Sequence, residues 1–103
     1  MGVVKVEPFG WDLYVVTTKK AAKAAGLDFD DMGFVATKGG LWYMGLPRKF
    51  DIGTLYHECH HCARLMNDEA GIVTTAQDHE ADVYLMESIA REVATVIYNR
   101  TIK

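Results

Sequence analysis

The 103-residue sequence contains no apolar run close to the roughly 20 residues that a membrane-spanning helix needs. Its first residues, MGVVKVEPFGW, also lack the apolar core and the small-residue cleavage site of a signal peptide. No run of Lys and Arg forms a basic face, and the formal net charge is −3. We therefore expect a cytoplasmic protein whose partners are neither a membrane nor a nucleic acid.

Cysteine is scarce as well. Cys59 and Cys62 are the two cysteines of the chain, and they stand three apart in a segment with a helical pattern, which does not suit a disulfide framework. With no export signal, we expect both to be reduced thiols. No internal repeat, low-complexity tract or linker divides the chain, and its length suits one domain over residues 1–103.

The first half of the sequence alternates short β-branched and aromatic runs with turn residues. VVKV and DLYVVT, separated by Pro8 and Gly10, predict a first hairpin. TKKAAKAAGL predicts a short helix closed by Gly26. GFVATK and LWYMGL, joined by Gly39 and Gly40, predict a second hairpin.

Two longer helices are predicted in the second half. The first covers about residues 52–69, with Asp51 as its N-cap. The second covers about residues 76–99 and starts from Thr74 or Thr75. The order strand, strand, helix, strand, strand, helix, helix predicts an α+β domain, in which a short antiparallel sheet of hairpins packs on both helices.

The stretch LYHECHHCARLM, residues 55–66, contains two overlapping metal-binding patterns. His57, Glu58 and His61 form the H-E-x-x-H pattern of zinc hydrolases, and the interleaved Cys-x-x-Cys fits half of a structural zinc site. On a helical wheel the two histidines lie within about 40° of each other, whereas both cysteines fall in an apolar stripe on the opposite side. We therefore expect the histidines to bind Zn²⁺ and the cysteines to be core thiols.

Glu58 lies about 100° around the helix from His57. It is too far round to share the metal, but it is well placed to accept a proton from a bound water molecule. The competing interpretation is a chance match of a three-residue motif on an ordinary amphipathic helix. Both motif histidines lie off the apolar stripe, which favours the metal interpretation. His60 is expected to be exposed or to lie behind the ligands.

A zinc site of this kind needs a third protein ligand, and TTAQDHEADVYLM offers Asp78, His79, Glu80 and Asp82. H-E-x-x-H followed by eighteen residues and Glu80 resembles the gluzincin metallopeptidases, the broad class of thermolysin and the zinc aminopeptidases. HECHH and DHEADVYL are also similar to the very short H-E-x-x-H proteins of phage genomes. The resemblance covers about residues 54–86 and implies a small zincin-like domain with Glu80 as the third ligand.

Asp78 is the competing third ligand. Asp78-x-x-Ala81-Asp82 resembles the E-x-x-A-D/N element of gluzincin-like proteases that act on phage repressors, although Asp78 also fits a capping box that starts at Thr75. The same resemblance implies that Asp82 accepts a hydrogen bond from a ligand histidine, and the alternative is a carboxylate at a helix interface. His79 is better interpreted as a semi-buried histidine than as a ligand.

Two further features bear on catalysis. The resemblance implies a Tyr or His that donates a hydrogen bond to the developing oxyanion, and Tyr84 or Tyr98 fits that role. The alternative is that both cover the edge of the core. The strand with Trp42 and Met44 precedes the motif helix, where zincin-like proteins carry an edge strand that pairs with extended peptide. Cross-strand packing explains these two residues equally well.

The leading hypothesis is a minimal gluzincin-like zinc metallopeptidase that acts on a protein or peptide. His57, His61 and Glu80 hold Zn²⁺, Glu58 is the general base, and Tyr84 assists. The alternative is a zincin-like protein, of phage origin, that uses zinc structurally and binds a host protein without hydrolysis. The intact Glu58 favours the enzyme and the small size favours the binder, while a protein without metal is the third possibility. The sequence indicates neither the substrate nor the oligomeric state.

Overall fold

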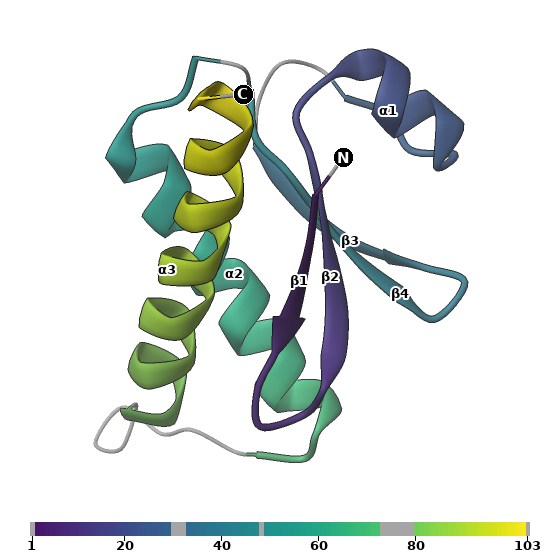
Figure 1. Ribbon diagram of the computed structural model, residues 1–103. Coiled ribbons are helices and arrows are strands. Elements are labelled where there is room, and N and C mark those ends of the chain that lie inside the picture. The colour runs from purple at the N-terminus through teal and green to yellow at the C-terminus, as the bar shows by residue number, and fades with distance from the viewer. Residues whose placement is uncertain (1, 30–32, 48, 73–79, 103) are drawn as a thin grey trace.

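A computed structural model describes residues 2–29, 33–47, 49–72 and 80–102 of the chain (Figure 1). In chain order its elements are β1 (Gly2–Val6), β2 (Trp11–Val16), α1 (Lys19–Ala24), β3 (Phe34–Lys38), β4 (Leu41–Gly45), α2 (Ile52–Glu69) and α3 (Glu80–Ile102). This confirms the predicted α+β order. The predicted start of the last helix near residue 76, with Thr74 or Thr75 before it, lies outside the described residues.

The four strands form one mixed sheet in the order β1-β2-β4-β3. β1 with β2 and β3 with β4 are antiparallel hairpins, but β2 and β4 run parallel. The prediction of an antiparallel sheet was therefore wrong for the central pair. The chain leaves β2 through α1, forms β3 at the far edge and returns as β4, and this long connection is what a parallel pair requires.

Local turn chemistry closes the elements where the sequence predicts it. Gly39 and Gly40 have φ angles of 60° and 79°, which suit a two-residue hairpin turn with the twist of the flanking strands. Gly26 ends α1 with a φ of 76°, and the Thr18 hydroxyl accepts a hydrogen bond from the Ala21 N–H at its start. Both glycine positions were predicted from the sequence because each depends on adjacent residues, whereas the Thr18 cap was not predicted.

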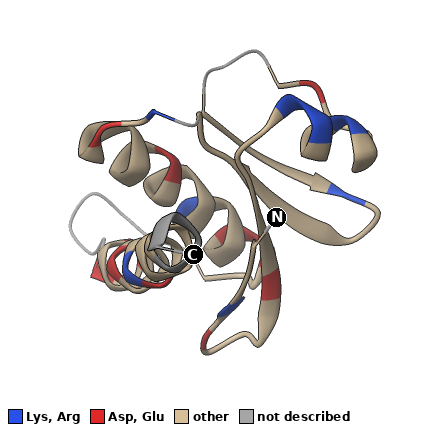
Figure 2. Cartoon of the chain, turned by 45° about the horizontal axis from the view of Figure 1, so that its top comes forward, with Lys and Arg blue, Asp and Glu red and all other residues tan. Residues whose placement is uncertain are grey.

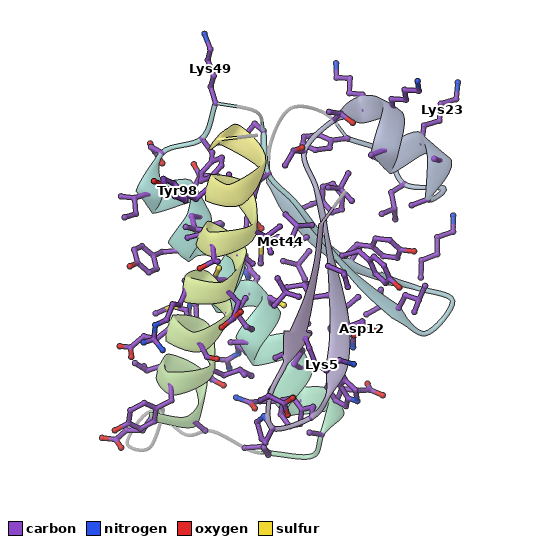
Figure 3. All side chains as sticks on the ribbon, in the orientation of Figure 1. Lys5, Asp12, Lys23, Met44, Lys49 and Tyr98 are labelled. Atoms are coloured by element: carbon purple, nitrogen blue, oxygen red, sulfur yellow. The ribbon has the colours of Figure 1, made fainter. Side chains whose placement is uncertain are left out.

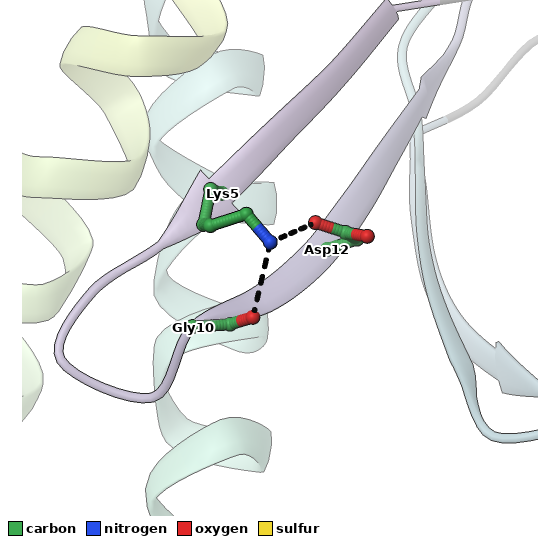
Figure 4. A network of polar contacts seen from close by, with 3 residues as sticks. All are labelled: Lys5, Gly10 and Asp12. Carbon is green, nitrogen blue, oxygen red and sulfur yellow. Dashed lines mark hydrogen bonds and ion pairs between the residues drawn. The ribbon is translucent and has the colours of Figure 1, made fainter.

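A small polar contact ties the first hairpin together (Figure 4). The Lys5 ammonium lies 3.0 Å from the Asp12 carboxylate and donates to the Gly10 carbonyl at 3.4 Å. The hydrogen bond and the negative charge of Asp12 raise the pKa of Lys5 above its ordinary value. Both side chains are well exposed, so the contact selects the register of the hairpin more than it stabilises the fold.

The sheet carries helices on both of its faces (Figure 1), and an apolar cluster lies on each side of it. α2 and α3 cover one face, and Met44 lies between that face and the helices (Figure 3). The buried residues of this main core are Val4, Val6, Leu13, Val15, Trp42, Met44, Leu46, Leu55, Cys59, Cys62, Ala63, Met66, Leu85, Ile89, Ala90 and Val93. α1 packs on the opposite face over a smaller cluster of Val16, Ala22 and Tyr43.

One buried polar contact joins the two long helices. The Asn67 side chain donates a 2.7 Å hydrogen bond from Nδ2 to Oδ1 of Asp82, and each residue is only 3% exposed. Asn67 is in the last turn of α2 and Asp82 is in the first turn of α3. The start of α3 is thereby held against the end of α2. Neither these helices nor α1 is long and apolar enough to cross a membrane, over the residues described.

Candidate metal centre

α2 presents a core face and a solvent face, as its sequence pattern predicts. The helix begins at Ile52 after Asp51, whose carboxylate accepts a 2.7 Å hydrogen bond from the Thr54 N–H. Cys59 and Cys62 are fully buried, free thiols on the core face. Burial raises the pKa of each thiol to about 12. The prediction of core thiols is confirmed, since such groups stay protonated at neutral pH and are poor metal ligands without deprotonation.

His57 and His61 form a close pair on the exposed face of α2. Their Nε2 atoms lie 3.1 Å apart in a hydrogen bond between the two rings, which meet edge to face with centroids 4.6 Å apart. Two imidazoles bound to one Zn²⁺ at 2.0–2.1 Å with a tetrahedral angle have nitrogens about 3.3 Å apart. The observed separation is therefore close to the one that a shared zinc ion requires.

Glu58 is the buried member of the motif, at 6% exposure. It packs against Gly33, which immediately precedes β3. A Cβ placed on Gly33 would lie 2.5 Å from Oε2 and 2.6 Å from Cγ of Glu58. Gly33 thus gives the carboxylate its place between helix and strand. Gly33 was not among the residues predicted from the sequence, although a glycine at an apolar strand is a recognised signal of close approach.

The motif residues line a cleft of about 450 Å³ between α2 and β3, called the histidine cleft here. Its walls are Gly33, Phe34, Val35, His57, Glu58, His61, Arg64, Leu65 and Asp68. β3 is an edge strand, because among the described residues it pairs with β4 and with no second strand. The side of β3 away from β4 therefore has backbone groups available to an added strand.

The strand that precedes α2 was predicted to be an edge strand, but it lies inside the sheet. Trp42 and Met44 belong to β4, which lies between β2 and β3, and both side chains are buried in the main core. The interpretation of an exposed edge carrying these two residues is therefore wrong, and packing accounts for them. The second hairpin joins the sheet through β4 because β4 pairs with β2, and this leaves β3 outside.

The structure does not bring Glu80 together with the histidine pair. Glu80 is exposed at the start of α3, and no group of three His, Cys, Asp or Glu side chains among the described residues is arranged to hold a metal. The contact of Asp82 with Asn67 explains this. Asn67 follows His61 by six residues, which is about 9 Å along a helix axis.

The other candidate residues are placed as follows. Asp78 and His79 lie outside the described residues. Asp82 accepts a hydrogen bond from Asn67 across the interface of α2 and α3, in line with the interpretation of Asp82 as an interface carboxylate. His60 is exposed, with its ring stacked 6.5 Å from that of His61. Exposure is one of the two positions that the sequence predicted for His60.

Tyr84 and Tyr98 do not line the histidine cleft. Tyr84 is exposed and lines a separate hollow of about 240 Å³ beside Phe9 and Ile72. Tyr98 is also exposed and projects from the last turns of α3 (Figure 3). Among the residues that the structure describes, the lining of the cleft therefore contains no phenol that could donate to a developing oxyanion.

Charge is distributed unevenly over the described residues. Lys19, Lys20 and Lys23 gather on α1, across the sheet from α2 (Figure 2). Arg64 carries the positive charge among the residues that line the histidine cleft, apart from the histidines themselves, and Asp68 carries a negative charge one turn further along α2. Comparison with protein-family models, with curated proteins and with solved structures finds no match to this chain.

Proposed function

We propose that the protein is a zinc-dependent peptidase with a zincin-like domain. The observation that carries the proposal is the 3.1 Å separation of the His57 and His61 Nε2 atoms on the wall of a cleft. The same cleft contains Glu58 and runs along the edge strand β3. Two histidines close enough to share a metal, a carboxylate and a free strand edge are among the parts that hydrolysis of an extended peptide needs, and a third protein ligand would complete the zinc site.

Each group has a defined task in this proposal. An extended substrate pairs with β3 by strand addition, which fixes the carbonyl to be attacked beside the histidine pair. His57 and His61 would hold the zinc ion, which would supply Lewis-acid activation of a water molecule. Glu58 accepts the proton of that water and then donates it to the leaving amine. Gly33 leaves the carboxylate of Glu58 the space that it occupies.

In this proposal His57 and His61 are two of the three protein ligands. Asp78 and His79, which lie outside the described residues, are the candidates for the third, and Glu80 serves as the control because the structure does not bring it together with the histidine pair. Loss of zinc in Asp78→Ala or His79→Ala, with its retention in Glu80→Ala, identifies the ligand. The free, buried thiols on α2 agree with the cytoplasmic location that we propose for the protein.

Metal content tests the proposal directly. We expect about one zinc per chain in protein purified without an affinity tag of histidines, and its loss in His61→Ala. His60→Ala is the matched control, because His60 is exposed on the same helix but does not line the cleft. Absence of zinc in the wild-type protein, even after zinc is supplied, would contradict the proposal.

Hydrolysis is tested separately. Glu58→Gln should retain zinc and lose cleavage of an unfolded protein substrate, because the amide cannot accept the proton. The second candidate function is a zinc-containing binding protein, of phage origin, that acts on a host protein without cleaving it. The absence of a tyrosine from the described lining of the cleft favours this candidate. It predicts unchanged function in Glu58→Gln.

A further inference from the structure

Arg64 extends the histidine cleft beyond the motif. It is exposed, it lines the cleft together with His61, and it forms no ion pair with any residue that the structure describes. An arginine side chain that lines a cleft without a carboxylate partner has its guanidinium available to a ligand. The opposite wall of the cleft, Gly33, Phe34 and Val35, contributes no charged side chain.

The position of Arg64 can be expressed in residues of substrate. Arg64 follows the midpoint between His57 and His61 by five residues, which is about 7.5 Å along a helix. An extended peptide advances about 3.3 Å per residue. A peptide that paired with β3 and ran along the axis of α2 would therefore bring a side chain about two residues from the bond at the histidine pair to the level of Arg64.

The chemistry of Arg64 selects the group that it would bind. A guanidinium presents a planar fork of N–H donors that matches the two oxygens of a carboxylate. Leu65, exposed beside it, adds apolar contact for the stem of such a group. Asp68 lies one turn further from the histidine pair and repels a second negative charge there. Glu58 adds a second carboxylate to the lining, so a carboxylate is favoured only beside Arg64 and a generally acidic peptide is repelled.

We propose that Arg64 is a specificity-determining residue that binds a carboxylate of the substrate about two residues from the bond held at the histidine pair. This inference rests on the proposed function for the identity of that bond. The carboxylate belongs either to an Asp or Glu side chain or to the C-terminus of the peptide. The substrate class is then an extended peptide with one acidic group near the cleavage point.

The test measures binding, so that it does not depend on turnover. Glu58→Gln protein is titrated, with and without zinc, with short Val- and Thr-rich peptides that carry one Asp at each position in turn. The Asn counterparts and peptides with a free or amidated C-terminus complete the set. At low salt we expect one Asp position, or the free C-terminus, to bind about three- to tenfold more tightly than its neutral counterpart.

Substitutions at Arg64 then assign the preference. In the Glu58→Gln background, Arg64→Met should abolish the difference and Arg64→Glu should reverse it toward a Lys-containing peptide. Arg91→Met is the matched control, since Arg91 is an exposed arginine of α3 that lines a different groove. A preference that survives Arg64→Met, or equal or undetectable binding of acidic and neutral peptides by the starting protein, would overturn the inference.

Failure of the proposed function has a different signature. A protein without zinc or without Glu58-dependent cleavage fails as a peptidase, yet can still show the Arg64-dependent preference in the titration without zinc. Conversely, zinc binding and cleavage without a charge preference would leave the peptidase in place and remove the role of Arg64. The side-chain and C-terminal sources of the carboxylate are separated by the amidated peptides, which lose the preference only in the second case.

Discussion

Asn67 and Asp82 meet in the interface of α2 and α3, with Nδ2 and Oδ1 2.7 Å apart and both side chains almost fully buried. The contact joins the last turn of one helix to the first turn of the next. Because this hydrogen bond holds the start of α3 against the end of α2, it also places Glu80, the first residue of α3, near the end of α2. The histidine pair lies nearer the start of α2. The buried contact between Asn67 and Asp82 therefore influences which residues of α3 lie near that pair.

Breaking this contact from one side should be costly. Asp82→Ala leaves the Asn67 amide buried without its acceptor, and we expect a loss of about 1–3 kcal/mol in the free energy of unfolding. Replacing both residues by Leu removes the unpaired group and should cost less than the sum of the single substitutions. Urea unfolding of the two single variants and the double variant measures this coupling. Strict additivity would show that the two side chains do not depend on each other.

Gly33→Ala should affect the site without affecting the metal. The added methyl group would lie 2.5 Å from Glu58 Oε2, so the carboxylate must move while His57 and His61 remain in place. We expect unchanged zinc content and a reduced rate of Glu58-dependent cleavage. Gly53→Ala, at an exposed position in the first turn of α2, is the control and should leave both unchanged. Equal rates in the two variants would show that the contact with Gly33 does not position Glu58.

The two thiols should be inert in the folded protein. Burial raises the pKa of Cys59 and Cys62 to about 12, so at neutral pH we expect negligible reaction with a thiol reagent until urea exposes both groups. The same shift predicts a pH dependence of stability. Since the unfolded thiols lose their protons near pH 9 and the folded ones near pH 12, this contribution is complete below pH 9 and decreases from there toward pH 12. Rapid labelling of the native protein would contradict the burial.

The N-cap of α2 should add a component of stability that acid removes. Hydrogen bonds from Thr54 lower the pKa of Asp51 below its ordinary value of 3.8. Its contribution is therefore present above pH 3.8 and is lost as the pH decreases through the lower, folded-state pKa. Asp51→Asn keeps a capping oxygen but does not titrate, so its thermal stability should show less acid dependence than that of the wild type. Identical pH profiles would exclude this role.

Local features of the sequence predict the local structure well. The bounds 52–69 of α2, its Asp51 cap and the hairpin turn at Gly39 and Gly40 were predicted correctly, because each depends on residues close in the chain. The position of His57 and His61 on one face of α2 follows from helical spacing in the same way. The helix wheel also assigned Cys59 and Cys62 correctly to the core.

The errors come from contacts between distant segments. No local pattern shows that β2 and β4 pair in parallel, and that pairing buries Trp42 and leaves β3 at the edge. The spacing from His61 to Glu80 matches a known motif, but the packing of α3 on α2 decides where Glu80 lies, and a spacing contains no information about packing. Gly33 was missed because its partner, Glu58, is distant in the sequence and becomes its neighbour only through the fold.

One face of α2 contributes residues to the main core, and the other face carries the histidine pair. When the core unfolds, the two imidazoles are therefore no longer held at their distance in the folded chain. Any ligand that binds this spacing in the folded chain stabilises the whole domain by RT ln(1 + [L]/Kd), where [L] is the free ligand concentration. Through this thermodynamic linkage, the melting temperature of the domain measured at increasing ligand concentration reports binding at a site on its surface.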